Sequence, residues 1–364
     1  MPEIKDNYAE LFCEVLKAGL WNKVPEVVLS VAEMRRIWTD SIKQAVSGLV
    51  AQSFMNTKSV HPRTAEMLQK RLMGIAATNF RQTHLLADSV KVLRAEGIDP
   101  LLLKGLGVAS FYHQPLLREC GDIDLYVCPE DYKRSFDVLI GGMKGIDEEE
   151  FEAEGKHSRL LINGLSIELH QYVDVLTPKY NAVFQKICDS SLGGGYGSLT
   201  VDDVSVNTPE PTFNSMYIFE HIWSHFVAAG VGFRQICDWV MLLHAVSHRL
   251  DLNRLGVMLE SLDLMKPWTV FGWIAVNLLG LPVDEMPFYD SGMKKKAVKV
   301  LSMIMKEGNF GYERKDRWTE SGHHGIDTIK HFIVITKRYL TIFPMFGNLA
   351  FEEYKNKLLF HLGR

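Results

Sequence analysis

The stretch Gly121-Asp-Ile-Asp-Leu-Tyr-Val127 places two aspartates one residue apart inside an otherwise apolar run. In a β-strand, side chains two residues apart point to the same face of the sheet. Asp122 and Asp124 are therefore expected to project together, while the apolar residues between and after them face a core. Two unpaired carboxylates repel each other, and a divalent cation is the usual reason to keep them side by side. Oxygen ligands of this kind suit Mg²⁺ or Mn²⁺.

The overall composition is that of an ordinary globular protein, with 364 residues of which 47% are hydrophobic and 23% charged. This length suggests two or three domains. The net charge of −4 provides no general basic field, so long DNA is not expected as a partner. We expect no secretory signal and no membrane span, because no suitable apolar run is present. The five scattered cysteines form no C-x-x-C motif and predict reduced thiols in the cytoplasm.

Hydrophobic periodicity divides the chain into three predicted parts. Residues 1–96 show apolar residues at three- and four-residue spacing and are expected to be helical, with a stop at Gly97 and Asp99-Pro100. Residues 97–207 alternate between strand and helix patterns, and residues 208–364 return to a helical pattern. The predicted fold is α+β, with a small mixed sheet as the core between two helical regions.

A hairpin after the aspartate strand is predicted to supply a third acid. The segment Arg159–His170 contains two strand-like runs joined by Asn163-Gly164, which is a strong hairpin signal. Alternation places Glu168 on the polar face of the second run, together with His170. If this strand pairs beside the aspartate strand, Asp122, Asp124 and Glu168 converge and can bind one or two divalent cations. Glu168, which comes from a different strand, is then the natural general base.

Basic residues flank the acids on the N-terminal side. Lys104-Gly105 follows a short predicted strand, and here the glycine would let the backbone approach a phosphate while the lysine adds a point charge. The structural alternative is a lysine at a strand end and a glycine that starts a turn. Arg118 either clamps a phosphate or pairs with the acids and offsets their repulsion.

Together, Lys104-Gly105, Arg118, the aspartate strand and Ile167–His170 resemble the uncharacterised nucleotidyltransferase family of bacteria. That family belongs to the DNA polymerase beta-like nucleotidyltransferase superfamily. The resemblance is strong from Leu101 to Gln171 and looser to Leu243. It implies a small mixed sheet with helices, a Mg²⁺ cofactor, and transfer of a nucleotidyl group from ATP or another NTP to an acceptor hydroxyl, with release of pyrophosphate.

By this resemblance Asp122 and Asp124 bind metal, and Glu168 is the third acid. It also implies nucleotide-binding roles for four further residues, namely His170, His225, Arg234 and Asp238, with Arg234 on a phosphate and Asp238 orienting it. One departure is that the wider superfamily carries a Gly-Ser pair where this chain has Lys104-Gly105.

The residues alone leave simpler readings of the later helices open. Arg234 and Asp238 are four residues apart and can form an intrahelical ion pair. His221 and His225 share a helix face, but the glutamate of an H-E-x-x-H zinc motif is missing, so packed histidines are the expected alternative.

Three other functions are compatible with the acids. A glycosyltransferase also holds a nucleotide sugar with Asp-x-Asp, but it normally has a larger α/β domain before the acids, and the stretch before Asp122 reads as mostly helical. A non-catalytic nucleotide-binding module would fit the absent Gly-Ser pair. An interaction protein built from the helical regions would leave the acids incidental. The sequence indicates neither the NTP nor the acceptor, which can be a small molecule, a protein or RNA.

Overall fold

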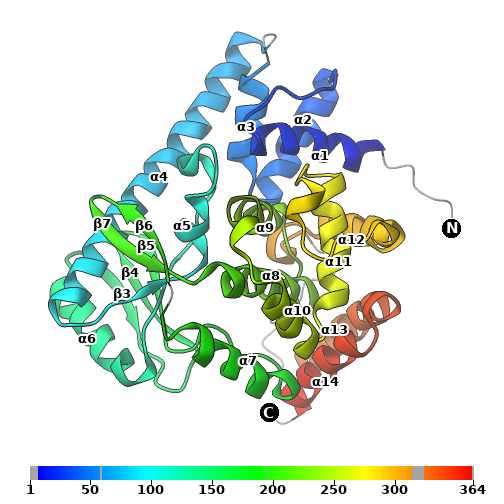
Figure 1. The fold of residues 1–364 in the computed structure, drawn as a ribbon. Helices are drawn as coiled ribbons and strands as arrows, with labels where there is room; N and C mark the ends of the chain where they lie inside the picture. Colours follow the sequence, from blue (N-terminus) through cyan, green and yellow to red (C-terminus); the bar gives the residue numbers. More distant parts are fainter. Residues whose placement is uncertain (1–6, 58–59, 195, 314–323, 363–364) are drawn as a thin grey trace.

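The computed structural model describes residues 7–57, 60–194, 196–313 and 324–362. Within these residues the chain is α+β, as predicted, with one seven-stranded mixed sheet surrounded by helices (Figure 1). The helices before the sheet are α1 (Asn7–Leu20), α2 (Val31–Lys43), α3 (Ser47–Met55) and α4 (Pro62–Ala95). The start of α2 is defined by a capping box, in which Ser30 and Glu33 satisfy each other's backbone N–H groups.

The sheet has the strand order β3-β4-β5-β2-β1-β7-β6. Its β2–β5 and β1–β7 pairs are parallel, and the other pairs are antiparallel. The predicted hairpin is confirmed, since Asn163 and Gly164 both adopt positive φ angles between β4 and β5. The strands are β1 (Leu101–Leu102), β2 (Ile123–Tyr126), β3 (Ile146–Glu150), β4 (His157–Ile162), β5 (Leu165–His170), β6 (Gly197–Val201) and β7 (Val204–Thr208).

Most of the remaining chain is helical. The segments between strands form α5 (Lys104–Ala109), α6 (Tyr132–Gly142), α7 (Pro178–Ser191) and the short 3₁₀ turns η1 (Pro115–Leu117) and η2 (Pro129–Asp131). After the sheet come α8 (Pro211–Ala228), α9 (Phe233–Val246), α10 (Leu252–Ser261), α11 (Met265–Asn277), α12 (Lys294–Glu307), α13 (His324–Phe346) and α14 (Asn348–Leu362). The 3₁₀ turns of this part are η3 (Ser247–Arg249), η4 (Val283–Glu285), η5 (Ser291–Met293) and η6 (Asn309–Gly311).

The apolar residues form two cores. One core fills the space between a face of the sheet and helices α4 and α6, and it includes Ile123 and Leu125 of β2. The larger core joins the helices before the sheet to those after it, for example through Phe12 of α1 and Phe233 of α9, whose ring centroids are 5.5 Å apart. Figure 1 shows the result, with the sheet and α4 on one side and the helices from α8 onward on the other. The two terminal helical regions are therefore packed together.

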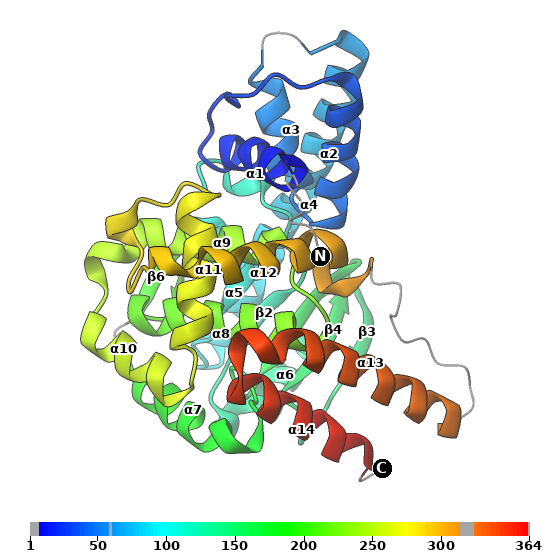
Figure 2. The ribbon, with the colours of Figure 1, turned by 90° about the vertical axis from the view of Figure 1, so that its right-hand side faces the viewer.

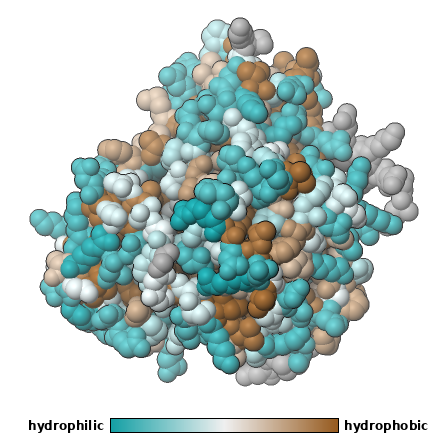
Figure 3. Space-filling view, in the orientation of Figure 1, coloured by the Kyte–Doolittle hydropathy of each residue, from teal (hydrophilic) through white to brown (hydrophobic). Residues whose placement is uncertain are grey.

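The predicted domain boundaries near residues 96 and 207 coincide with the two ends of the sheet region. The division into domains stays a proposal. Figure 2 shows α13 and α14 side by side as a hairpin at the C-terminal end. The face seen in Figure 3 is mostly hydrophilic, with small brown patches between the polar residues. Among the described residues, no helix is both long and apolar enough to cross a membrane.

Candidate active site

Two acids lie directly opposite each other on neighbouring strands. Asp124 of β2 is paired in register with Glu168 of β5, and Tyr126 with His170. Opposed residues project from the same face of a sheet, so both carboxylates lie on the face away from the α4–α6 core. The hairpin thus pairs beside the aspartate strand, as the sequence predicts.

Asp124 is buried and contacts the amine of Lys104 and the imidazole of His170. Its Oδ1 atom lies 3.0 Å from the Lys104 Nζ atom and 3.0 Å from the His170 Nε2 atom. Burial alone would raise the pKa of Asp124, but Lys104 and His170 together hold that pKa well below its usual range. Asp124 is therefore a carboxylate at neutral pH.

The other two acids are more open to solvent. Asp122 lies at the exposed rim just before β2, where partial desolvation and repulsion from Glu168 and Asp124 raise its pKa. Desolvation raises the pKa of Glu168, but the hydrogen bond with His170 and the charges of His157 and His170 together lower it overall. The fields of the three acids overlap, so this face of the sheet favours a bound cation.

The turn after β1 brings Lys104 to the acids. Lys104 and Gly105 both have positive φ angles, of 26° and 46°, and a Cβ atom at Gly105 would lie 3.3 Å from the carbonyl oxygen of Asp122. A glycine is therefore well suited to this turn, and the left-handed conformation of Lys104 is strained. Desolvation lowers the pKa of Lys104, but Asp124 and the other acids raise it by more. The net pKa is raised, so the amine stays charged.

Arg118 does not pair with Asp122 or Asp124, which corrects one of its two predicted roles. Its guanidinium donates from Nε and Nη2 to the two carboxylate oxygens of Asp238, at 3.0 and 2.5 Å. The Tyr112 hydroxyl donates to the same carboxylate at 2.7 Å, and all three side chains are buried. In this closed pair the Nε and Nη2 groups of Arg118 are both taken up by Asp238, so the two residues position α9 against the segment before β2.

The predicted pair of Arg234 and Asp238 is also replaced. Arg234 donates from Nη1 to the backbone carbonyl of Glu119 at 3.2 Å, while Asp238 binds Arg118. Among the described residues, the buried Nε of Arg234 has no hydrogen-bond partner. A Cβ atom on Gly121 would lie 3.8 Å from the Arg234 guanidinium, which places this cation beside the start of the aspartate strand.

Two histidines of helix α8 lie near Lys104. His221 and His225 stand one turn apart, with ring centroids 4.4 Å apart. Burial, followed by the nearby charge of Lys104, lowers the pKa of His225 to about 4 and that of His221 well below its usual value. Both imidazoles are therefore neutral at pH 7. No third metal ligand accompanies these two histidines among the residues described.

Three residues of the site were missed from the sequence. His157 of β4 is paired in register with His170, and counting outward from the Asn163-Gly164 turn would have found it. Lys156 and Asp174 come from loops and carry no local signal. The Lys156 Nζ atom lies 3.3 Å from Oδ1 of the buried Asp174, and both charges act on His225.

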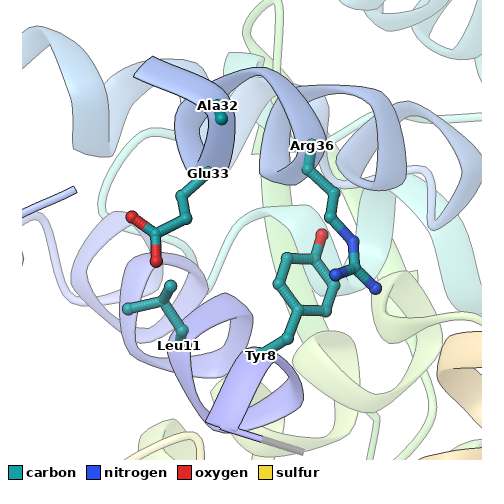
Figure 4. Close-up of a pocket in the computed structure, with 5 residues that line it drawn as sticks. All are labelled: Tyr8, Leu11, Ala32, Glu33 and Arg36. Atoms are coloured by element: carbon teal, nitrogen blue, oxygen red, sulfur yellow. The ribbon is translucent and has the colours of Figure 1, made fainter. Parts of the chain in front are cut away.

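A separate hollow of about 350 Å³ lies between α1 and α2 (Figure 4). It is lined by Tyr8, Leu11, Ala32, Glu33 and Arg36, and the Arg36 guanidinium lies 3.4 Å from the centre of the Tyr8 ring. None of the residues Asp122, Asp124 and Glu168 lines this hollow, so we do not include it in the candidate active site.

A family model described as an uncharacterised nucleotidyltransferase matches residues 30–280. The matched part is more than half of the chain and contains both the sheet and helices α8 and α9, so the protein belongs to this family. The family resemblance seen in the sequence is thereby confirmed, while the bacterial source and the wider superfamily stay predictions. No curated protein and no solved structure matches the chain significantly.

Proposed function

We propose that this protein is a Mg²⁺-dependent nucleotidyltransferase that moves an NMP group from an NTP to an acceptor hydroxyl and releases pyrophosphate. The observation that carries the proposal is the strand register that sets Asp124 opposite Glu168. The family match supports nucleotidyl transfer as the reaction class.

The residues present fit a divalent cation. Asp122, Asp124 and Glu168 offer carboxylate oxygens, and the pKa of Asp122 is raised by desolvation and then by the negative charges of Glu168 and Asp124, which a cation would offset. Lys104 and His170 both contact Oδ1 of Asp124, and neither of these contacts uses Oδ2. Mn²⁺ would suit the same oxygens. When bound, such a cation neutralises phosphate charge and helps to align the attacking hydroxyl.

The side chains then divide the reaction between them. Glu168, ionised because its pKa is lowered, accepts the proton of the acceptor hydroxyl. The acceptor oxygen bonds to the α-phosphorus, the bond from that phosphorus to the bridging oxygen breaks, and its electron pair leaves with pyrophosphate. Lys104 and Arg234 neutralise the phosphates, Gly105 lets the backbone approach them, and His225 lines the nucleotide side.

His170 serves as a positioning residue in this scheme. It is fully buried, and its Nε2 atom lies 3.0 Å from Asp124 and 3.4 Å from Glu168, so it fixes the spacing of the two acids. The acceptor class, whether small molecule, protein or RNA, is left open by these contacts. The five free cysteines agree with the predicted cytoplasmic location, which stays a prediction.

One observation favours a non-catalytic nucleotide-binding module as the second candidate. The Lys104 amine already provides a positive charge at Asp124, where it competes with a metal ion. The glycosyltransferase alternative has less support, because the described residues before Asp122 form helices and only the two-residue strand β1.

The test is pyrophosphate release from each NTP with Mg²⁺, with a panel of acceptors, together with the NTP-induced shift in melting temperature. We expect NTP to stabilise the wild type and, to a smaller extent, Glu168→Gln, which lacks one carboxylate of the metal site, with pyrophosphate release lost in the variant. The matched control is Glu148→Gln, on the exposed edge strand β3, which should behave as wild type. Binding without release in the wild type would favour the non-catalytic module, and the absence of binding to any NTP would refute both.

A further inference from the structure

A second cluster of potential metal ligands lies beside the two aspartates and contains imidazole nitrogens. His157 of β4 and His170 of β5 are opposed in register, and Glu168 precedes His170 by two residues. All three side chains therefore share one face of the sheet. Within the described residues, this is the group of histidines and acids whose ligand atoms all lie within 4.8 Å of one another.

The separations suit a small cation. The His157 Nε2 atom is 3.7 Å from Oε1 of Glu168, and the His170 Nε2 atom is 3.4 Å from Oε2 of the same carboxylate. For metal–ligand bonds of about 2.1 Å, neighbouring ligands of a tetrahedral site lie about 3.4 Å apart. The strand pairing alone thus holds these groups near the spacing that a metal needs.

Two imidazoles and one carboxylate select a different class of cation from three carboxylates. Mg²⁺, Ca²⁺ and Mn²⁺ prefer oxygen ligands, whereas Zn²⁺ and Co²⁺ accept imidazole nitrogen readily. Two histidines and a glutamate also leave coordination positions open, which is typical of catalytic rather than structural zinc sites. The His170 side chain is fully buried, while those of His157 and Glu168 are 33% and 22% exposed, so the open side faces solvent.

A hydrogen-bonded cluster is the competing explanation. The single Nε2 atom of His170 lies near oxygens of both Asp124 and Glu168, at 3.0 and 3.4 Å, and one N–H group cannot donate fully to both. Asp124 already receives the Lys104 amine on the same oxygen. Metal binding at Nε2 would replace the N–H group there, so Asp124 would keep the Lys104 amine on that oxygen while His170 Nε2 and Glu168 bind the cation.

We propose that His157, Glu168 and His170 bind a divalent transition-metal ion, of the Zn²⁺ or Co²⁺ class, next to the Asp122–Asp124 pair. The site shares Glu168 with the proposed Mg²⁺ site, so the two positions together form a centre with one oxygen-rich and one nitrogen-containing half. The proposal goes beyond nucleotidyl transfer and does not depend on it, because the ligands and their spacing stand whether or not the protein turns over an NTP.

The test uses the full chain, freed of metal by a chelator and titrated with Co²⁺. We expect the visible absorption of Co²⁺ bound to nitrogen and oxygen ligands, with one equivalent bound. His157→Gln should weaken Co²⁺ binding by more than about 100-fold, since even residues that only support a ligand cost about 10- to 100-fold. Arg159→Gln is the matched control: it changes the next same-face residue of β4, which offers no ligand, and should bind Co²⁺ as the wild type does.

Asp122→Asn separates the two halves, since it removes an oxygen ligand of the proposed Mg²⁺ site and should leave the Co²⁺ spectrum unchanged. Circular dichroism and melting temperature establish that each variant is folded. Equal Co²⁺ affinity in the wild type and His157→Gln, or no Co²⁺ absorption band in the wild type, would overturn the proposal. Pyrophosphate release with Mg²⁺ is measured in the same variants. If the Co²⁺ proposal fails but His157→Gln still releases pyrophosphate, the proposed nucleotidyltransferase function is unaffected.

Discussion

Two ion pairs of similar composition each involve a basic residue of the segment between β1 and β2, and they have different roles. In the pair of Arg118 and Asp238, the carboxylate oxygens are matched by guanidinium N–H groups and the Tyr112 hydroxyl. In the pair of Lys104 and Asp124, the acid lies opposite a second carboxylate, and the lysine backbone is strained. A closed pair fastens two elements together, whereas an excess of acid beside a strained turn indicates a site built for a ligand.

Removing the closed pair of Arg118 and Asp238 should have the largest effect on the free energy of unfolding. Arg118→Met leaves the Asp238 carboxylate buried without its charge partner, so we expect unfolding to cost about 3–5 kcal/mol less than in the wild type. Urea denaturation measures this change. Arg71→Met is the control, since Arg71 is 40% exposed in its ion pair with Glu119 and should lose about 1 kcal/mol or less. Equal losses in the two variants would contradict the distinction between closed and exposed pairs.

The pair of Lys104 and Asp124, which we call the open pair, should matter more for turnover than for the free energy of unfolding. Lys104→Met removes a charge beside Asp124, while His170 still donates to that acid. We expect turnover of an NTP to fall by about 10²- to 10³-fold, the usual cost of losing one electrostatic contact in an active site. The loss of stability should be smaller than in Arg118→Met. Lys133→Met, on the exposed surface of α6, should change neither quantity.

If Lys104→Met unfolds as easily as Arg118→Met and retains its turnover, the Lys104 pair is structural too. The contrast between the two pairs would then fail.

A pH titration of stability probes the neutral imidazoles near the open pair. His225 has a pKa of about 4 in the folded protein, because of burial and Lys104, against about 6.5 when unfolded. The unfolded chain binds this proton first as the pH falls, so stability is lost from about pH 6.5 down to about pH 4. We expect this group to cost about 2 kcal/mol between pH 7 and pH 5.

Urea denaturation of His225→Gln at the same pH values should show a shallower loss of stability. His221 contributes in the same direction, so the slope will not vanish. An unchanged slope in His225→Gln would place His225 away from Lys104 and in contact with water.

The smallest effect concerns Asp122, whose pKa is raised in the folded protein. The unfolded chain loses this proton first as the pH rises, so Asp122 weakens the fold above its folded pKa and has no effect below its unfolded value of about 4. Asp122→Asn should therefore melt slightly higher than the wild type at pH 7, and equally at pH 3.

Added Mg²⁺ should reverse this order at pH 7 by stabilising the wild type more than the variant. Asp88→Asn, on the exposed surface of α4, controls for a general effect of removing negative charge. A melting temperature of Asp122→Asn below that of the wild type at pH 7 without metal would show that Asp122 is stabilised by an unrecognised partner.

Local periodicity explains how much of the site could be predicted. The turn at Asn163-Gly164 and the strand alternation that sets Asp124 opposite Glu168 agree with the structure, whereas Asp122 lies just before β2 begins. The register of the hairpin also fixes His157 opposite His170, which simple counting from the turn would have revealed. Each of these contacts depends on residues close in sequence or on one strand pairing.

By itself, the sequence determined the α+β class, the family, and which face of each strand carries acids, because hydrophobic burial forces every strand to alternate. Only the tertiary structure decided that Arg118 binds Asp238, 120 positions further along the chain, and that Lys156 and Asp174 join the site from loops. It also decided that helices from both ends of the chain share one core. Such pairings depend on how whole helices pack across the molecule, and no short-range pattern records that packing.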